Sequence, residues 1–277
     1  MSRLEKKIID QLNKYGYSIV SDVFSEKKCT NTIYTINQLL KKINQKKNNE
    51  RMLVDYGQVV LRDLILRSPK IFLKYLNIPL VKKILNKVFQ DEYILDNYMA
   101  SNSISVKKKY KALVHIDSHL PAKELENTSD IVVLLCLDNF TKNNGCTKIW
   151  PKSHKLGVRI QNKKKYLKNN NKFKFVEAKR GSMIFFLGQT WHQIGQNINN
   201  ESRWGILMHF KRWWIKPSTD FTKCGKKIYQ LLNDHERQLF GFNSISPKYD
   251  FKNKTRMLKT LRNVKNVSKN YFKAISY

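Results

Sequence analysis

Short apolar segments follow one another between residues 91 and 216, and no helical pattern separates them. Clusters of Asn, Gly, Pro and Lys bound each segment, as is typical of β-strands joined by turns. Strands without intervening helices pair antiparallel, so this region predicts a sandwich or barrel of seven or eight strands. The segments are YILDNYMASNSIS, ALVHID, IVVLLCLDNF, TKIW, FKFVEAK, SMIFFLG and RWGILMHFKRWWI.

The chain on either side of this β-rich region has helical spacing of apolar residues. Helices are expected over residues 3–14, 25–43 and 59–89, the last interrupted at two prolines, and a short strand over 17–20. Helical spacing returns beyond Pro217. We expect a single domain over residues 1–277, with a helical N-terminal part (about 1–90), a β core (about 91–216) and a helical C-terminal part (about 217–277).

Composition and cysteine usage point to a soluble, unexported protein. The chain is 41% apolar and 12% aromatic, as a folded globular protein is, and no stretch approaches the roughly 20 apolar residues that cross a bilayer. Its amino terminus, MSRLEKKIID, is charged where a signal peptide is apolar. The four cysteines form no CxxC pair. The sequence therefore predicts a cytoplasmic protein without a membrane partner.

The formal net charge of +32 raises the question of nucleic-acid binding. Most of the 53 basic residues are Lys, however, and they are spread along the whole chain. Arg, which makes bidentate contacts with phosphate and guanine, is scarce, and no nucleic-acid-binding motif is present. We expect a small-molecule partner, with the positive charge favouring an anionic one. No feature of the sequence indicates an oligomeric state.

Three side chains are candidate metal ligands. His115 and Asp117 end the apolar segment ALVHID, and residues i and i+2 of a strand point to the same side. His192 follows 75 residues after Asp117, at the end of another apolar segment. Two His and one carboxylate form the facial triad of non-haem Fe(II) oxygenases, which leaves coordination positions open.

Arg203 follows His192 after ten intervening residues, at the start of the next strand. Its planar guanidinium can hold the far carboxylate of a dicarboxylate co-substrate through two parallel hydrogen bonds. A structural salt bridge is the alternative role for this arginine.

In this pattern the sequence resembles the phytanoyl-CoA dioxygenase (PhyH-like) family of Fe(II)/2-oxoglutarate-dependent oxygenases. The resemblance covers roughly residues 5–240, and Lys152 stands where the family usually has Gly. The matching stretches, in order, are the opening helix with GYSIV, SPKIFLKYLNIPLVKKIL, HID, DNFTKNNGCTKIWPKSH and RGSMIFFLGQTWHQIGQNINNESR.

The resemblance implies a mainly β protein with flanking helices and a double-stranded β-helix (jelly-roll, cupin-like) core. It further implies an enzyme that uses Fe(2+), 2-oxoglutarate and O2 to hydroxylate a small molecule, with release of succinate and CO2. Relatives that halogenate carry a small residue in place of Asp117, so this carboxylate favours hydroxylation. Desaturation, epoxidation or cyclisation at the same site, and a non-catalytic jelly-roll binding protein, remain alternatives.

The resemblance also assigns roles to individual residues. It implies that His115, Asp117 and His192 bind iron and that Arg203 binds 2-oxoglutarate. Asn102 and Tyr98 are further candidates for contact with the co-substrate, and His119 is a candidate for the substrate pocket.

Overall fold

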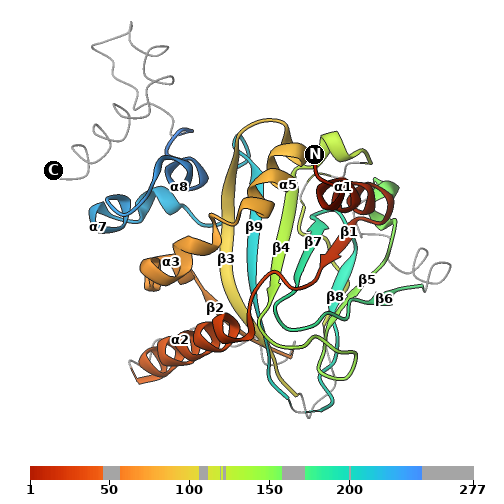
Figure 1. The fold of residues 1–277 in the computed structure, drawn as a ribbon, viewed down its shortest axis with the longest axis horizontal. Coiled ribbons are helices and arrows are strands. Elements are labelled where there is room, and N and C mark those ends of the chain that lie inside the picture. The colour runs from red at the N-terminus through yellow and green to blue at the C-terminus, as the bar shows by residue number, and fades with distance from the viewer. Residues whose placement is uncertain are drawn as a thin grey trace, which may run out of the picture.

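Two antiparallel β-sheets form the centre of the computed structural model, which describes residues 1–45, 57–105, 112–118, 120, 123–157, 172–199 and 201–244 (Figure 1). The larger sheet has the strand order β1-β7-β4-β9-β3-β2, and the smaller has the order β6-β5-β8. The predicted mainly β fold with flanking helices is confirmed, although the two sheets do not close into a barrel. The strands are β1 (Tyr17–Val20), β2 (Gln58–Arg62), β3 (Tyr93–Ser103), β4 (Asp130–Cys136), β5 (Thr147–Ile149), β6 (Lys174–Phe175), β7 (Met183–Leu187), β8 (His192–Ile194) and β9 (Arg203–Arg212).

Strand β4 shows why the larger sheet is apolar on both faces. Successive side chains of a strand point to opposite faces, and every residue of β4 is buried. Ile131, Val133 and Leu135 belong to the core that the helices cover, whereas Val132 and Leu134 belong to a second core shared with the smaller sheet. The continuous apolar run that predicted this strand therefore reflects burial on both sides.

Helices cover the face of the larger sheet that is turned away from the smaller one. They are α1 (Arg3–Tyr15), α2 (Glu26–Gln45), α3 (Leu64–Arg67), α4 (Pro69–Phe72) and α5 (Pro79–Phe89), with α7 (Lys226–Tyr229) and α8 (Asp234–Leu239) near the C-terminal end of the described chain. Short 3-10 turns lie at Leu73–Tyr75, Leu125–Asn127, Ser153–Leu156 and Phe221–Lys223.

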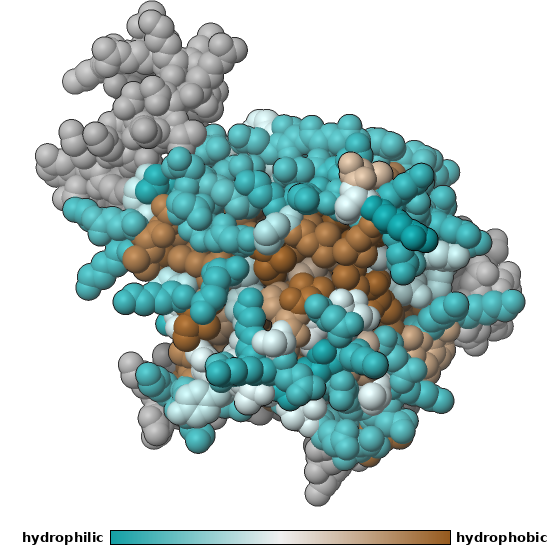
Figure 2. Space-filling view, in the orientation of Figure 1, coloured by the Kyte–Doolittle hydropathy of each residue, from teal (hydrophilic) through white to brown (hydrophobic). Residues whose placement is uncertain are grey.

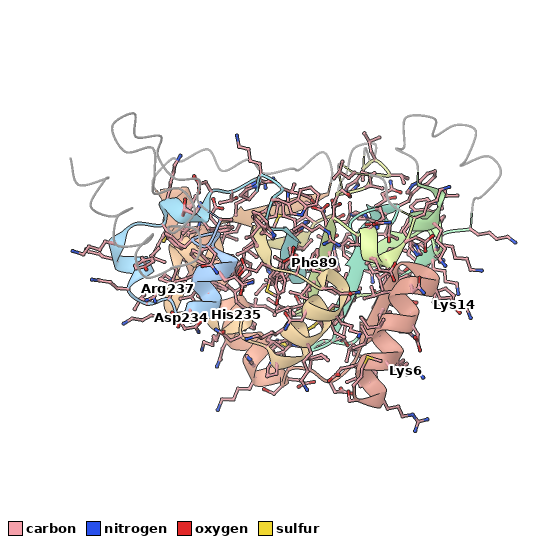
Figure 3. The ribbon with its side chains drawn as sticks, turned by 90° about the horizontal axis from the view of Figure 1, so that it is seen from above. Lys6, Lys14, Phe89, Asp234, His235 and Arg237 are labelled. Atoms are coloured by element: carbon pink, nitrogen blue, oxygen red, sulfur yellow. The ribbon has the colours of Figure 1, made fainter. Side chains whose placement is uncertain are left out.

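Helix α1 illustrates how local sequence sets an element and its packing. Ser2 and Glu5 form a capping box at its start, and Gly16, with φ of +84°, ends it in a left-handed conformation. Ile8 and Leu12 are buried beneath the helix. Seen from above, α1 lies beside α5 and carries exposed lysines on its outer side (Figure 3). Hydrophilic residues surround an apolar area in the middle of the face drawn in Figure 2.

The structure differs from the expected elements at two places. Residues 59–62 form part of strand β2, not a helix, because β2 extends the larger sheet by pairing with β3. The segment ALVHID forms no full strand, and only His115 makes an isolated bridge, with His192. No helix within the described residues is long and apolar enough to cross a membrane. The Lys-rich residues 163–168 and the residues from 245 onward lie outside the described residues.

Gly181, in the turn before β7, has a backbone that no other residue fits. Its φ is +82°, and an added Cβ would stand 2.3 Å from the carbonyl oxygen of Phe24. We expect Gly181→Ala to lower the free energy of unfolding by about 2–4 kcal/mol, because backbone strain and a steric clash act together. Gly241→Ala is the control, since Gly241 has φ of +84° and an added Cβ there would meet its nearest atom at an ordinary 3.5 Å. It should cost about 1–2 kcal/mol. Denaturant titration measures the free energy of unfolding of both variants. An equal decrease in the two would show that the clash with Phe24 has no energetic cost.

Candidate metal centre

The backbone brings the two candidate histidine ligands together. His115 N–H donates to the carbonyl of His192 at 2.9 Å, and His192 N–H donates to the carbonyl of His115 at 3.0 Å. This reciprocal pair places the two imidazole rings side by side, with centroids 4.1 Å apart. Residues 77 positions apart in the sequence thus share one edge of the smaller sheet.

Hydrogen bonds to the backbone fix the tautomer of both rings. His115 Nδ1 lies 3.1 Å from the carbonyl oxygen of Leu113, and His192 Nδ1 lies 3.0 Å from that of Thr190. A carbonyl oxygen only accepts, so each Nδ1 carries the proton and donates it. Each Nε2 is then left with a lone pair, which is the form in which imidazole binds a metal.

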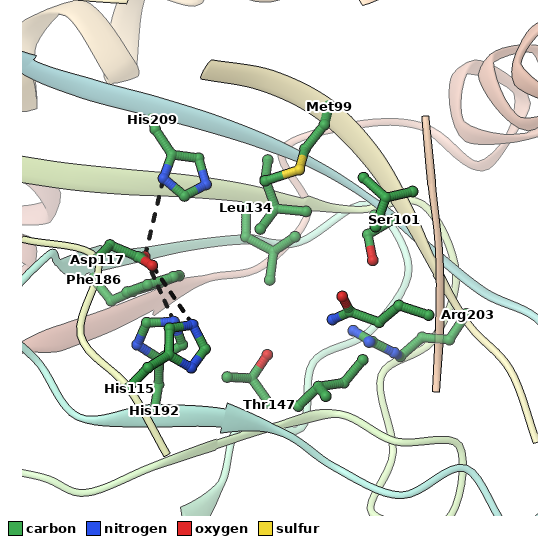
Figure 4. Close-up of a pocket in the computed structure, with 15 residues that line it drawn as sticks. Met99, Ser101, His115, Asp117, Leu134, Thr147, Phe186, His192, Arg203 and His209 are labelled. Carbon is green, nitrogen blue, oxygen red and sulfur yellow. Dashed lines mark ion pairs between the residues drawn. The ribbon is translucent and has the colours of Figure 1, made fainter. Parts of the chain in front are cut away.

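Asp117 completes the group of three. Its Oδ1 lies 3.6 Å from His115 Nε2 and its Oδ2 lies 3.5 Å from His192 Nε2 (Figure 4). The three side chains offer ligand atoms that all lie within 4.8 Å of one another. Neighbouring ligands at metal–ligand bonds of about 2.1 Å stand roughly 3 Å apart, so the spacing suits one ion. Two imidazoles and one carboxylate are also a donor set that suits Fe(II).

Burial prepares His192 for metal binding. Its side chain is 9% exposed, and burial lowers the pKa of His192 to about 4. Nearby Asp117 acts in the opposite direction, but its effect is the smaller one. The imidazole is therefore neutral at pH 7, and no proton has to leave Nε2 before a metal binds.

A cavity of about 160 Å³ extends from these three residues to Arg203. In Figure 4 the histidines and Asp117 stand at one end, Arg203 and Ser101 stand at the other, and Thr147 lies between them. Arg203 is 4% exposed, and its guanidinium carbon lies 4.3 Å from the centre of the Phe140 ring. This position gives a compact dicarboxylate a cation at one end of the cavity and the metal site at the other.

Asn102 and Tyr98 take up other positions than those expected. Neither lines the cavity, because β3 turns its odd-numbered residues, Met99 and Ser101, towards it. Asn102 Oδ1 accepts a hydrogen bond from the backbone N–H of Arg203 at 2.8 Å, so Asn102 positions the start of β9. Tyr98 is fully buried under the helices, where its hydroxyl donates to the carbonyl of Phe72 at 3.1 Å. The structure gives it a place in the core instead of a co-substrate contact. His119 lies outside the described residues.

His209 lines the same cavity, although no sequence motif contains it. Its Nδ1 lies 4.0 Å from Asp117 Oδ2, and its Nε2 finds no hydrogen-bond partner among the described residues. The signal that could have found it is the period of two along β9, because Arg203, Gly205, Leu207 and His209 all face the cavity.

The double-sheet fold and this site define a non-haem iron oxygenase that depends on 2-oxoglutarate. A family model for phytanoyl-CoA dioxygenase (PhyH) matches residues 12–205. The chain therefore belongs to the phytanoyl-CoA dioxygenase family, whose members use Fe(II), 2-oxoglutarate and O2.

Individual proteins resemble the chain at lower identity. The uncharacterized proteins Mb1539 of Mycobacterium bovis and Rv1501 of Mycobacterium tuberculosis are each 24% identical over 247 residues, which cover 86% of this chain and 87% of theirs. Among solved structures, the non-heme alpha ketoglutarate dependent epimerase SnoN from nogalamycin biosynthesis is similar in fold, with a TM-score of 0.59, 15% identity and coverage of 76% of this chain and 81% of SnoN. A second SnoN structure, in complex with Fe3+, alpha ketoglutarate and nogalamycin RO, has a TM-score of 0.58 at 15% identity, covering 76% of this chain and 84% of that one.

Proposed function

We propose that the protein hydroxylates a small-molecule substrate, with His115, Asp117 and His192 holding Fe(II) and Arg203 holding the far carboxylate of 2-oxoglutarate. The observation that carries the proposal is the placement of the three candidate ligands and the buried guanidinium at opposite ends of one cavity. In the reaction, 2-oxoglutarate loses CO2 and takes up one oxygen atom of O2 to become succinate, and the second oxygen atom is inserted into a substrate C–H bond.

The residues around the cavity orient the groups that hold the metal and the co-substrate. The carbonyls of Leu113 and Thr190 orient the two imidazoles, and the Asn102 amide fixes the backbone of Arg203. Apolar side chains, Leu134, Phe186 and Leu207, line the cavity between the two ends and limit the water that enters. The bound Fe(II) supplies the O2 chemistry. No side chain has to act as a general base.

Asp117 supports hydroxylation over halogenation. A carboxylate in the third ligand position leaves three positions of a six-coordinate metal open, which the keto-acid end of the co-substrate and O2 can fill. Because Asp117 occupies the third ligand position, no additional coordination position is open to a halide. Desaturation, epoxidation, cyclisation and epimerisation use the same metal site, and analysis of the product separates them from hydroxylation.

Turnover of 2-oxoglutarate tests the proposal directly. With Fe(II), 2-oxoglutarate and O2 the protein is expected to release succinate, and a chelator should abolish that release until Fe(II) is restored. Small acids and amino acids form the first substrate screen, because the net charge of +32 favours anionic molecules. The stimulating compound should gain one oxygen atom derived from ¹⁸O₂. Absence of succinate with Fe(II) and 2-oxoglutarate both bound would contradict catalysis, and a product without added oxygen would contradict hydroxylation.

A further inference from the structure

A buried polar cluster begins at Ser118, the residue after Asp117. Ser118 Oγ lies 2.5 Å from Ser129 Oγ, and the Ser129 hydroxyl donates to Asp130 Oδ2. All three residues are buried, with exposures of 3%, 2% and 8%. Either hydroxyl can be the donor in the contact between Ser118 and Ser129, and the Ser118 hydroxyl also donates to the carbonyl oxygen of Leu120 at 2.8 Å. One hydrogen-bonded chain thus links the loop of Asp117 to the start of β4.

A buried cation stands at the other end of this chain. Lys211 is 3% exposed, and its Nζ lies 3.9 Å from Asp130 Oδ1 and 2.7 Å from Asp96 Oδ1. An ammonium group out of contact with water is stable only beside such partners. Lys211 thus pairs directly with Asp96 and faces Asp130 Oδ1, the carboxylate oxygen that Ser129 does not hold.

Gly188 packs the same segments tightly against each other. Its carbonyl accepts the backbone N–H groups of Asp117 at 2.8 Å and Ser118 at 3.0 Å, and its own N–H donates to the carbonyl of Asp130 at 2.8 Å. An added Cβ on Gly188 would lie 2.6 Å from the Cβ of Asp130 and 3.3 Å from that of Ser118. The Asp117 loop, the turn after β7 and the first residue of β4 are therefore held in one place.

We propose that Lys211, Asp130, Ser129, Ser118 and Gly188, together called the Asp117 support, are positioning residues that set the Asp117 carboxylate for metal binding. The inference rests on the proposed function, in which Asp117 is a metal ligand. The support acts through the backbone at residues 117–118. Side chains that orient a metal ligand typically change metal affinity about 10–100-fold when they are replaced.

Two variants break the Asp117 support, and a third is a matched control. Ser129→Ala removes the link between Ser118 and Asp130, and Asp130→Asn removes the charge that faces Lys211. Glu236→Gln removes another buried carboxylate, 4% exposed, which accepts hydrogen bonds from the side-chain amide of Asn77 and the backbone N–H of Asn233, away from the Asp117 support. All three variants lose a buried polar contact, so all three should lose thermal stability.

Fe(II) affinity separates the variants. It is measured under argon with saturating 2-oxoglutarate, through the charge-transfer absorption of the Fe(II)–2-oxoglutarate pair. We expect the Fe(II) dissociation constant to rise about 10–100-fold in Ser129→Ala and Asp130→Asn, and by no more than about 2-fold in Glu236→Gln. At saturating Fe(II), the 2-oxoglutarate dissociation constant should stay at the wild-type value, because Arg203 is untouched.

The outcomes distinguish this inference from the proposed function. Wild-type Fe(II) affinity in both test variants would overturn the role of the Asp117 support, and so would an equal loss in Glu236→Gln, which would mark a general effect of instability. Failure of the wild-type protein to form the Fe(II)–2-oxoglutarate complex would instead overturn the proposed function itself.

Discussion

Asp117→Ala is expected to abolish specific Fe(II) binding and, with it, the release of succinate. The carboxylate stands 3.5–3.6 Å from both Nε2 atoms and is the one anionic member of the ligand group. Its loss should therefore exceed the about 10–100-fold change that follows loss of a group behind a ligand, and we expect at least about 1,000-fold weaker binding. Anaerobic Fe(II) titration measures the affinity, and succinate release at saturating 2-oxoglutarate measures turnover.

A control for this variant is Asp10→Ala. Asp10 lies on the exposed side of α1, and its replacement removes one negative charge from the protein without touching the cavity. It should leave Fe(II) affinity and turnover at wild-type values. Wild-type Fe(II) affinity in Asp117→Ala would remove this aspartate from the metal site.

Arg203→Ala is expected to raise the 2-oxoglutarate dissociation constant about 10–150-fold, because a hydrogen bond to a charged group contributes about 1.5–3 kcal/mol. Fe(II) affinity should stay within about 3-fold of the wild-type value, because the variant changes none of the three ligands. Arg203 is buried at the end of the cavity opposite the metal site. Calorimetry under argon gives both constants.

Arg203→Lys keeps the charge and loses the fork of parallel donors, so its 2-oxoglutarate affinity should fall between those of Arg203→Ala and the wild type. The Arg203 side chain also stacks on Phe140, so a thermal melt of each variant has to accompany the binding data. If Fe(II) binding is lost before 2-oxoglutarate binding, Arg203 has a structural role instead of a recognition role.

Much of the fold could be predicted because apolar residues alternate or run continuously along the strands. The β-rich region, the amphipathic α1 and the short β1 all follow from local pattern, and the structure has them within a few residues. Strand β2 could not be predicted in this way, because it is a strand only through its pairing with β3. The two-stranded contact of His115 with His192 is likewise a tertiary feature that ALVHID alone does not encode.

At the site, residue types and spacing identified the group that the structure brings together. The spacing of His115, Asp117, His192 and Arg203 was informative because the open ligand set and its cation must serve one small co-substrate. The sequence could not place Tyr98. Alternation along β3 separates two faces of the strand, but it does not tell which face lines the cavity and which packs under the helices. The Asp117 support has no local signal, because its contacts join residues far apart in the sequence, such as Asp130 and Lys211.

Iron-edge anomalous diffraction from crystals grown under argon with Fe(II) and 2-oxoglutarate tests the central claim most directly. One anomalous peak should appear in contact with His115 Nε2, His192 Nε2 and the Asp117 carboxylate, and the far carboxylate of 2-oxoglutarate should meet the Arg203 guanidinium. An iron peak elsewhere, or a 2-oxoglutarate molecule held away from Arg203, would contradict the assignment of this cavity as the active site.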